Sequence, residues 1–161
     1  MRSTLLSAVA VFALAVSTAA LASGGGSGGA DAPSNKPLDP NYVKAKSLIE
    51  AKNYQEAMPL LQKVVATNPR DADAYTLMGY ATRKSGDPNG SLQYYNTALS
   101  LDPRHIGAHE YIGEAYLQLD KPQEAAQHLA RLDSLCVFGC TEYRQLKAAI
   151  ANYKAGKKPT N

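Results

Sequence analysis

The sequence predicts an all-α fold: a solenoid of three helix-turn-helix hairpins that ends in a capping helix. Three observations indicate this fold. Proline, glycine, small and large apolar residues recur every 34 positions. Each 34-residue unit contains two segments with the start signals and apolar spacing of helices. One further apolar helical stripe follows the third unit. Such a period is typical of proteins built from stacked hairpins.

Four series of residues carry the period of 34: Pro69 and Pro103; Gly79 and Gly113; Ala57, Ser91 and Ala125; and Leu61, Tyr95 and Leu129. Glycine and other small residues allow two helices to cross closely. The large residue four positions after each small one lies on the same helical face and fills the space between hairpins. Both glycines are therefore expected at helix crossings, where a larger side chain would push the backbones apart.

The expected helices cover residues 39–52, 54–67, 72–85, 88–100, 106–119, 122–134 and 141–154, with no strand. Asp87 is a good N-cap, and Pro88 fits the first helical turn because its missing N–H has no partner there. Asn53 and Thr141 are expected to cap their helices in the same way. Tyr143, Leu146, Ile150 and Tyr153 form the apolar stripe of the capping helix, which covers the last repeat.

The residues before the first repeat have a different composition. Residues 1–22 have the pattern of a cleavable signal peptide, with Arg2, an apolar run and an A-x-A site at 20–22. The apolar run is about a dozen residues, short of the roughly 20 that span a bilayer. Residues 23–38 are rich in Gly, Ser and Pro and are expected to form a flexible linker. The sequence therefore predicts a bacterial protein that is exported to the periplasm or secreted and is not inserted in the membrane after cleavage.

The expected domain covers residues 39–154, with repeats at about 38–71, 72–105 and 106–139 and a capping helix at 141–154. Residues 155–161 are expected to form a disordered tail. The formal net charge is +3 and charged residues make up 19%. This balance is far from the strongly basic composition typical of proteins that bind nucleic acids.

Over residues 38–136 the chain resembles tetratricopeptide repeat proteins. The matching motif residues are Ala57 and Pro69; Tyr75, Gly79, Ala98 and Pro103; and Gly113, Tyr116 and Ala125. The chain departs from the pattern at Val137, where a proline is usual, and at Asn41 and His109, where a bulky aromatic residue is usual. The resemblance implies a right-handed α-solenoid. It also implies a scaffold or adaptor that holds a protein or peptide segment in a concave groove and has no enzymatic activity.

The family's groove positions fall on the first helix of each hairpin: Tyr42, Lys46, Ile49, Thr76, Tyr80, Arg83, Lys84, Glu110, Glu114 and Leu117. The family's carboxylate clamp uses Lys, Arg and Asn, but its places are taken here by Tyr42, Lys46, Leu77, Gly107 and Tyr111. A C-terminal carboxylate is therefore not the expected ligand. The resemblance instead implies a groove that runs from a basic end to an acidic end. A matching partner carries the opposite polarity around an aromatic or apolar anchor. The alternative is that these charges only solvate an exposed face.

Cys136 and Cys140 are the only cysteines. In an oxidising compartment an even count of nearby cysteines favours a disulfide, which would fix the angle between the last hairpin and the capping helix. Two alternatives are a reactive thiol at a helix N-terminus and a metal site that includes His128. A redox- or metal-handling accessory protein is therefore the alternative function.

The motifs of common enzymes are absent from the sequence. It contains no G-x-S-x-G, P-loop, H-E-x-x-H or dinucleotide-binding pattern. We therefore expect no catalytic residue, no cofactor and no metal. Neither the identity of the partner nor the oligomeric state is indicated.

Overall fold

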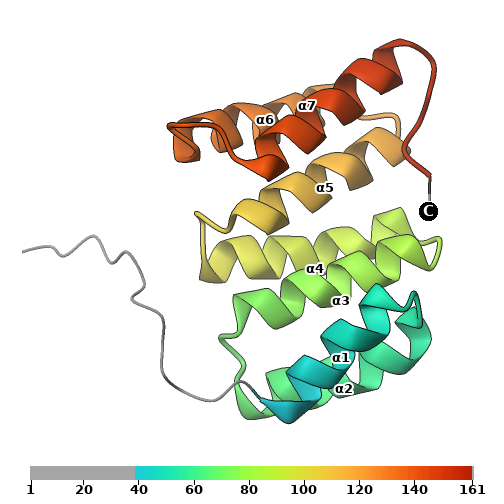
Figure 1. Ribbon diagram of the computed structural model, residues 1–161, viewed down its shortest axis with the longest axis vertical. Helices are drawn as coiled ribbons and strands as arrows, with labels where there is room; N and C mark the ends of the chain where they lie inside the picture. Colours follow the sequence, from blue (N-terminus) through green and yellow to red (C-terminus); the bar gives the residue numbers. More distant parts are fainter. Residues whose placement is uncertain (1–38, 161) are drawn as a thin grey trace, which may run out of the picture. The chain divides into compact units, whose positions relative to one another are not determined.

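The computed structural model describes residues 39–160, in which every regular element is a helix (Figure 1). The seven helices are α1 (Pro40–Glu50), α2 (Tyr54–Thr67), α3 (Ala72–Lys84), α4 (Pro88–Leu101), α5 (Ile106–Gln118), α6 (Pro122–Leu135) and α7 (Thr141–Lys154). This confirms the all-α prediction, and no boundary differs from its expected position by more than two residues. The expected signal peptide and linker lie outside the described residues.

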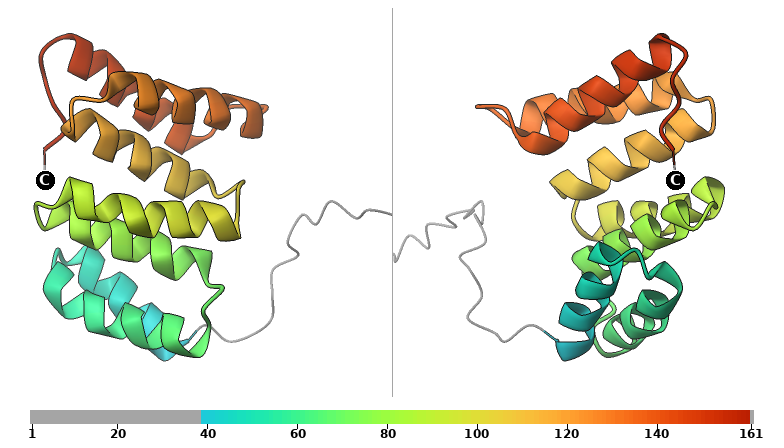
Figure 2. Two further views of the ribbon diagram at one scale, coloured as in Figure 1. Left: turned by 180° about the vertical axis from the view of Figure 1, so that it is seen from behind. Right: turned by 45° about the vertical axis from the view of Figure 1, so that its right-hand side comes forward.

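The hairpins stack in the order of the chain, from α1 and α2 at one end to α7 at the other (Figure 1). The first helices contact one another in succession: α1 with α3, α3 with α5, and α5 with α7. Each second helix contacts the first helices before and after it, and within residues 39–160 the second helices do not pack on one another. The first helices and α7 therefore form one continuous layer, which we call the inner layer and which Figure 2 shows from two further directions.

The periodic residues pack as the sequence predicts. Ala57, Ser91 and Ala125 are fully buried, as are Leu61 and Tyr95. A Cβ atom on Gly79 would lie 2.5 Å from Cε1 of the Tyr95 ring. A Cβ atom on Gly113 would lie 2.6 Å from Cδ2 of Leu146 in α7. Both glycines are therefore required where a large side chain of a neighbouring helix meets the backbone.

Side chains at the helix starts satisfy the free N–H groups of the first turns. Asp71 accepts a hydrogen bond from the Ala74 amide at 2.8 Å, and Asp87 accepts one from the Gly90 amide at 2.7 Å. Two expected caps are wrong. Asn53 makes no capping hydrogen bond. Thr141 is already the first residue of α7, and the sulfur of Cys140 accepts from the Tyr143 amide at 3.4 Å.

The structure describes the residues after α7 as far as Thr160 and gives residues 157–160 no regular secondary structure, so the expected disorder of this tail stays a prediction. Gly156 has φ +80°, a left-handed conformation that glycine adopts without strain. The Gly156 amide donates to the Tyr153 carbonyl, and the Lys157 amide donates to the Asn152 carbonyl, both at 2.9 Å. These two bonds form a Schellman cap, which reverses the chain at the end of α7.

Candidate functional site

The expected groove residues divide into two groups. Tyr42, Lys46, Tyr80, Lys84 and Glu114 keep part of their surface in solvent. The other five are buried: Ile49 (9% exposed), Thr76 (3%), Arg83 (1%), Glu110 (5%) and Leu117 (0%). α3 and α5 each pack between two neighbouring helices of the inner layer and two second helices, so only a narrow strip of their surface faces the solvent, and α1 packs on α2 and α3. Thr76, Arg83, Glu110 and Leu117 therefore lie beneath the inner face, whereas Ile49 still reaches the cavity described next.

A cavity of about 360 Å³ opens on the inner face between α1 and α3. We call it the lysine–tyrosine cavity, because it is lined by Lys46, Ile49, Glu50, Lys52, Tyr54, Leu77, Tyr80, Lys84 and Tyr111. Four of the expected groove residues meet there: Lys46, Ile49, Tyr80 and Lys84. The remaining lining residues were not among the expected ones.

Lys52 lies in the turn between α1 and α2, and Tyr54 is the first residue of α2, so a first-helix template includes neither. Lys52 has φ +63°, a left-handed conformation that turns the chain sharply before α2. Leu77 and Tyr111 occupy places of the clamp, but the sequence analysis gave them no role in binding. The concentration of ten tyrosines after residue 40 was the one sequence signal for an aromatic surface.

Three tyrosine rings form a row across the cavity. The ring centroids of Tyr54 and Tyr80 are 6.2 Å apart in an edge-to-face arrangement, and those of Tyr80 and Tyr111 are 4.9 Å apart. Aromatic pairs at these distances stabilise each other's orientation. The row therefore presents a preformed aromatic surface that comes from three helices.

The charges near the cavity differ from the expected basic-to-acidic gradient. The guanidinium of Arg83 pairs with Glu114 at 2.7 Å and lies over the Tyr80 ring at 5.5 Å. Burial, followed by the charges of Glu114 and Glu142, raises the pKa of Glu110 to about 8. Glu110 is therefore mostly protonated near neutral pH, and Glu114 is neutralised by Arg83. The acidic end is lost, and the same ion pair removes Arg83 from the basic end, which leaves Lys46 and Lys84 there.

Phenol groups on this face stay protonated under ordinary conditions. Burial, followed by the charge of Asp73, raises the pKa of Tyr42 to about 12. Burial, followed by the charge of Glu110, raises the pKa of Tyr111 to about 12. Both hydroxyls are therefore available as neutral hydrogen-bond donors to a ligand.

The sulfur atoms of Cys136 and Cys140 lie within disulfide distance, and their Cα atoms are 5.5 Å apart. The loop between them exposes Val137 and Phe138 to solvent. His128, the third member of the alternative metal site, instead packs against His109. Within residues 39–160, no three His, Cys, Asp or Glu side chains are grouped as metal ligands would be.

The pair of His109 and His128 was not foreseen. Their Nδ1 atoms are 2.9 Å apart, and Nε2 of His109 lies 3.2 Å from the Pro103 carbonyl oxygen. A carbonyl only accepts, so Nε2 of neutral His109 carries the proton, and its Nδ1 accepts from the Nδ1–H of His128. Burial, followed by the charge of His109, lowers the pKa of His128 to about 4. The pair therefore joins α5 to α6 as two neutral rings.

None of the helices in residues 39–160 is long and apolar enough to cross a membrane.

Comparison with known proteins places the fold in a family. The family model described as "Anaphase-promoting complex, cyclosome, subunit 3" matches residues 51–132. Anaphase-promoting complex subunit 7 of Dictyostelium discoideum is 31% identical over 99 residues. That match covers 58% of this chain but only 17% of the subunit 7 protein.

Two solved structures illustrate the range of similar folds. MamA 41-end from Desulfovibrio magneticus RS-1 has a TM-score of 0.56 at 33% identity, over 59% of this chain and 54% of that one. The first TPR of Spaghetti (RPAP3), bound to the HSP90 peptide SRMEEVD, has a TM-score of 0.64 at 20% identity, over 71% of this chain and 93% of that one. The second likeness shows the fold alone. The chain spans about half of the MamA chain and a small part of the subunit 7 protein.

Proposed function

The chain belongs to the family described as anaphase-promoting complex, cyclosome, subunit 3, and is a tetratricopeptide repeat protein, and we propose that it holds an acidic segment of a partner protein on its inner face. Proteins of this fold serve as interaction scaffolds, and the chain is one of them. We propose further that it works without enzymatic activity and after export, in agreement with the signal-peptide pattern of residues 1–22.

The lysine–tyrosine cavity is the observation that carries this proposal. Lys46, Lys52 and Lys84 surround the row of tyrosine rings. Within residues 39–160 none of these three ammonium groups has an ion-pair partner, whereas Arg83 deeper in the fold does. Lysines attract carboxylates over several ångströms, and the tyrosines offer a large contact area with polar tips. The expected ligand is therefore a segment with acidic residues next to an aromatic or apolar side chain.

The partner differs in one respect from the one that the groove template implies. A segment with acidic and basic ends was expected from the polarity of the groove. Because Glu110 is mostly protonated and Glu114 is paired with Arg83, the expected acidic end offers no free carboxylate to a basic end on the partner. Glu50 is the one carboxylate among the residues that line the cavity, where it stands against three lysines. Net negative charge and one aromatic or apolar anchor are sufficient for binding at the α1–α3 part of the face.

Selection from a display library of random peptides on the full chain tests the proposal. The selected sequences should be enriched in Asp, Glu and aromatic residues, and their affinity should fall as salt is added. Tyr80→Ala should weaken binding by about 2 kcal/mol, since a central aromatic contact is lost. Lys52→Glu should weaken binding as well, whereas Lys63→Glu makes the same charge change on the exposed part of α2 and should not. Selected peptides that bind both charge variants and Tyr80→Ala like the parent would disprove the site.

The alternative function, redox or metal handling at Cys136 and Cys140, has one supporting observation. Cys140 caps α7, where the helix dipole and the Tyr143 amide would stabilise a thiolate after reduction. Replacement of both cysteines by serine separates the two functions. The scaffold proposal requires unchanged peptide binding in the double variant. The alternative requires a thiol pair that cycles readily between oxidised and reduced forms.

A further inference from the structure

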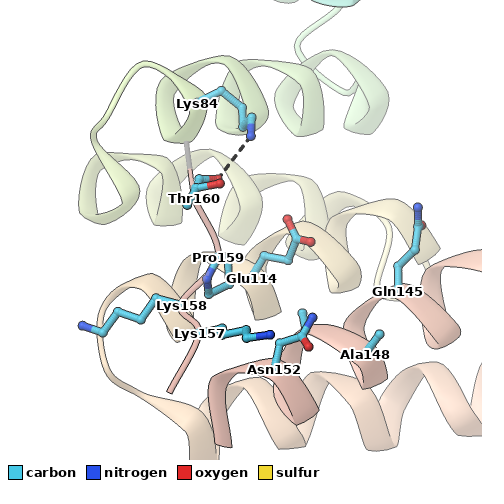
Figure 3. A pocket seen from close by; sticks show the side chains of 10 residues that line it. Lys84, Glu114, Gln145, Ala148, Asn152, Lys157, Lys158, Pro159 and Thr160 are labelled. Atoms are coloured by element: carbon cyan, nitrogen blue, oxygen red, sulfur yellow. Dashed lines mark hydrogen bonds between the residues drawn. The ribbon is translucent and has the colours of Figure 1, made fainter. Parts of the chain in front are cut away.

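The chain that follows α7 lies across the inner layer instead of extending into solvent. The Schellman cap at Gly156 turns it back, and residues 157–160 run past α5 to the end of α3 (Figure 3). Figure 3 shows Lys157 directed toward Asn152, and Lys158 directed to the opposite side. The two neighbouring lysines therefore face different environments, as in an extended peptide bound to a surface.

Three helices or turns contact this segment through different groups. Nζ of Lys84 in α3 donates to the Thr160 carbonyl at 3.3 Å. Nε2 of Gln118 in α5 donates to the Pro159 carbonyl at 3.3 Å. The Lys158 ammonium pairs with the Asp120 carboxylate in the turn between α5 and α6. That carboxylate also accepts a hydrogen bond from the Tyr153 hydroxyl at 2.9 Å, which orients it toward the segment.

The segment lines one side of an open cavity of about 400 Å³. The other walls are Lys84 of α3, Glu114 of α5, and Gln145, Ala148, Ala149 and Asn152 of α7. This side of the cavity is therefore formed by a segment whose contacts are made by two backbone carbonyls and the side chain of one lysine.

We infer that the inner face of α3, α5 and α7 is a second peptide-binding surface, and that residues 157–160 of the chain itself occupy it. The surface selects an extended segment with a lysine beside a proline. The side chains of Gln118 and Lys84 donate hydrogen bonds to two successive backbone carbonyls, and the Asp120 carboxylate pairs with the lysine ammonium. Proline favours the extended conformation and needs no partner for an amide hydrogen, so it fits between the two ends.

The occupancy is reversible, because the contacts are individually weak. The Lys158–Asp120 pair is more than half exposed on both sides, and exposed ion pairs contribute little. Only a few residues separate the end of α7 from the segment, so its effective concentration at the surface is on the order of millimolar or higher. Proximity thus maintains the docked state, and a competing peptide of similar sequence has to overcome it.

Peptide binding in trans tests the inference. We would prepare a shortened chain that ends at Gly156 and add a synthetic peptide of residues 155–161 to the ¹⁵N-labelled protein. Amide signals of Glu114, Gln118 and Asn152 should shift at a peptide concentration on the order of millimolar. The full chain should show no such shifts, since its surface is already occupied. A peptide with Lys158→Glu should fail to bind the shortened chain. Absence of shifts in the shortened chain, or equal shifts in both proteins, would overturn the inference.

A measurement in the full chain keeps the test independent of the shortened one. Heteronuclear NOE values of the Lys158 and Thr160 amides report whether the segment is held. Asp120→Lys should lower these values to those of a free chain end, and the double variant Asp120→Lys with Lys158→Glu should restore them. Low values in the parent, or no effect of Asp120→Lys, would equally disprove docking. Neither outcome depends on the ligand proposed for the lysine–tyrosine cavity.

Discussion

The Nη2 atom of Arg83 lies 2.7 Å from Oε2 of Glu114, and this ion pair joins α3 to α5 beneath the inner face. The side chain of Arg83 is 2% exposed and that of Glu114 is 23% exposed. Arg83 also contacts the face of the Tyr80 ring, which belongs to the proposed binding surface. Arg83 therefore positions a binding residue from below and holds two hairpins together.

Arg83→Ala should destabilise the fold by about 3 kcal/mol, because it removes one partner of a largely buried ion pair and leaves a cavity. Chemical denaturation followed by circular dichroism measures this change. Lys84→Ala, the adjacent and more exposed position, should change the free energy of unfolding by about 0.5 kcal/mol or less. Equal effects of the two substitutions would show that the ion pair contributes no stability.

Substitutions at the two periodic glycines should destabilise the helix crossings. A side chain at Gly79 meets the Tyr95 ring, and one at Gly113 meets Leu146. Gly79→Leu and Gly113→Leu should each cost about 1–3 kcal/mol or more through overpacking. Gly107→Ala is the matched control, since a Cβ there has no neighbour closer than 3.6 Å. It should be neutral or slightly stabilising, and a neutral result at Gly79 and Gly113 would contradict the packing.

The sequence predicts the fold of this protein better than its site, and the reason is physical. The residues at Gly79, Gly113 and Tyr95 repeat because the same hairpin contact recurs, so a period of 34 identifies them without coordinates. Exposure on the first helix does not follow from the period. The exposure of a first-helix side chain depends on how much of that helix the neighbouring hairpins cover, and they bury Arg83 and Glu110.

Contacts between distant segments also escape a repeat pattern. Arg83 and Glu114 belong to different hairpins, and the sequence assigned them to opposite ends of a groove. Disorder was predicted for the residues after α7 because five of the last seven, AGKKPTN, are charged, small or proline. Gly156 at the end of an apolar helical stripe was an available signal for a chain reversal.

Cys136 and Cys140 should be joined to each other in protein that is prepared without reductant. Intact mass before and after reductive alkylation decides this, since only reduced material should gain two alkyl groups. The double Cys→Ser variant should keep its helicity and lose about 2 kcal/mol of stability, because the closed loop is short. Two thiols that are alkylated without reduction would exclude the disulfide.

Acid should weaken the contact between α5 and α6 through His128. Burial lowers its pKa to about 4 in the fold, whereas the ordinary value is about 6.5. The unfolded chain then binds more protons between these values, so stability is lost as the pH falls from about 6.5 to about 4. We expect a loss of about 2 kcal/mol from this residue. His128→Gln keeps a donor for His109 and does not titrate, so its unfolding curves should lack this part of the acid dependence.

Alkaline pH should lower the stability of the fold through ionisation of Glu110. Its pKa is about 8 in the fold and 4.5 in the reference state, because burial and the charges of Glu114 and Glu142 disfavour the carboxylate. Here the folded chain binds the extra proton, so stability falls as the pH rises from about 4.5 to about 8.

Glu110→Gln reproduces the protonated form and removes this dependence. The variant should therefore be more stable than the parent at alkaline pH, by about 3 kcal/mol, and the two should converge near pH 5. Urea unfolding at a series of pH values measures the difference. The variant His128→Gln in the same series separates the loss of stability at acidic pH from the loss at alkaline pH. If Glu110→Gln and the parent keep a constant difference from about pH 5 to about pH 9, Glu110 is ionised in the fold. The acidic end of the groove would then be restored, and a partner with a basic end would become the better ligand.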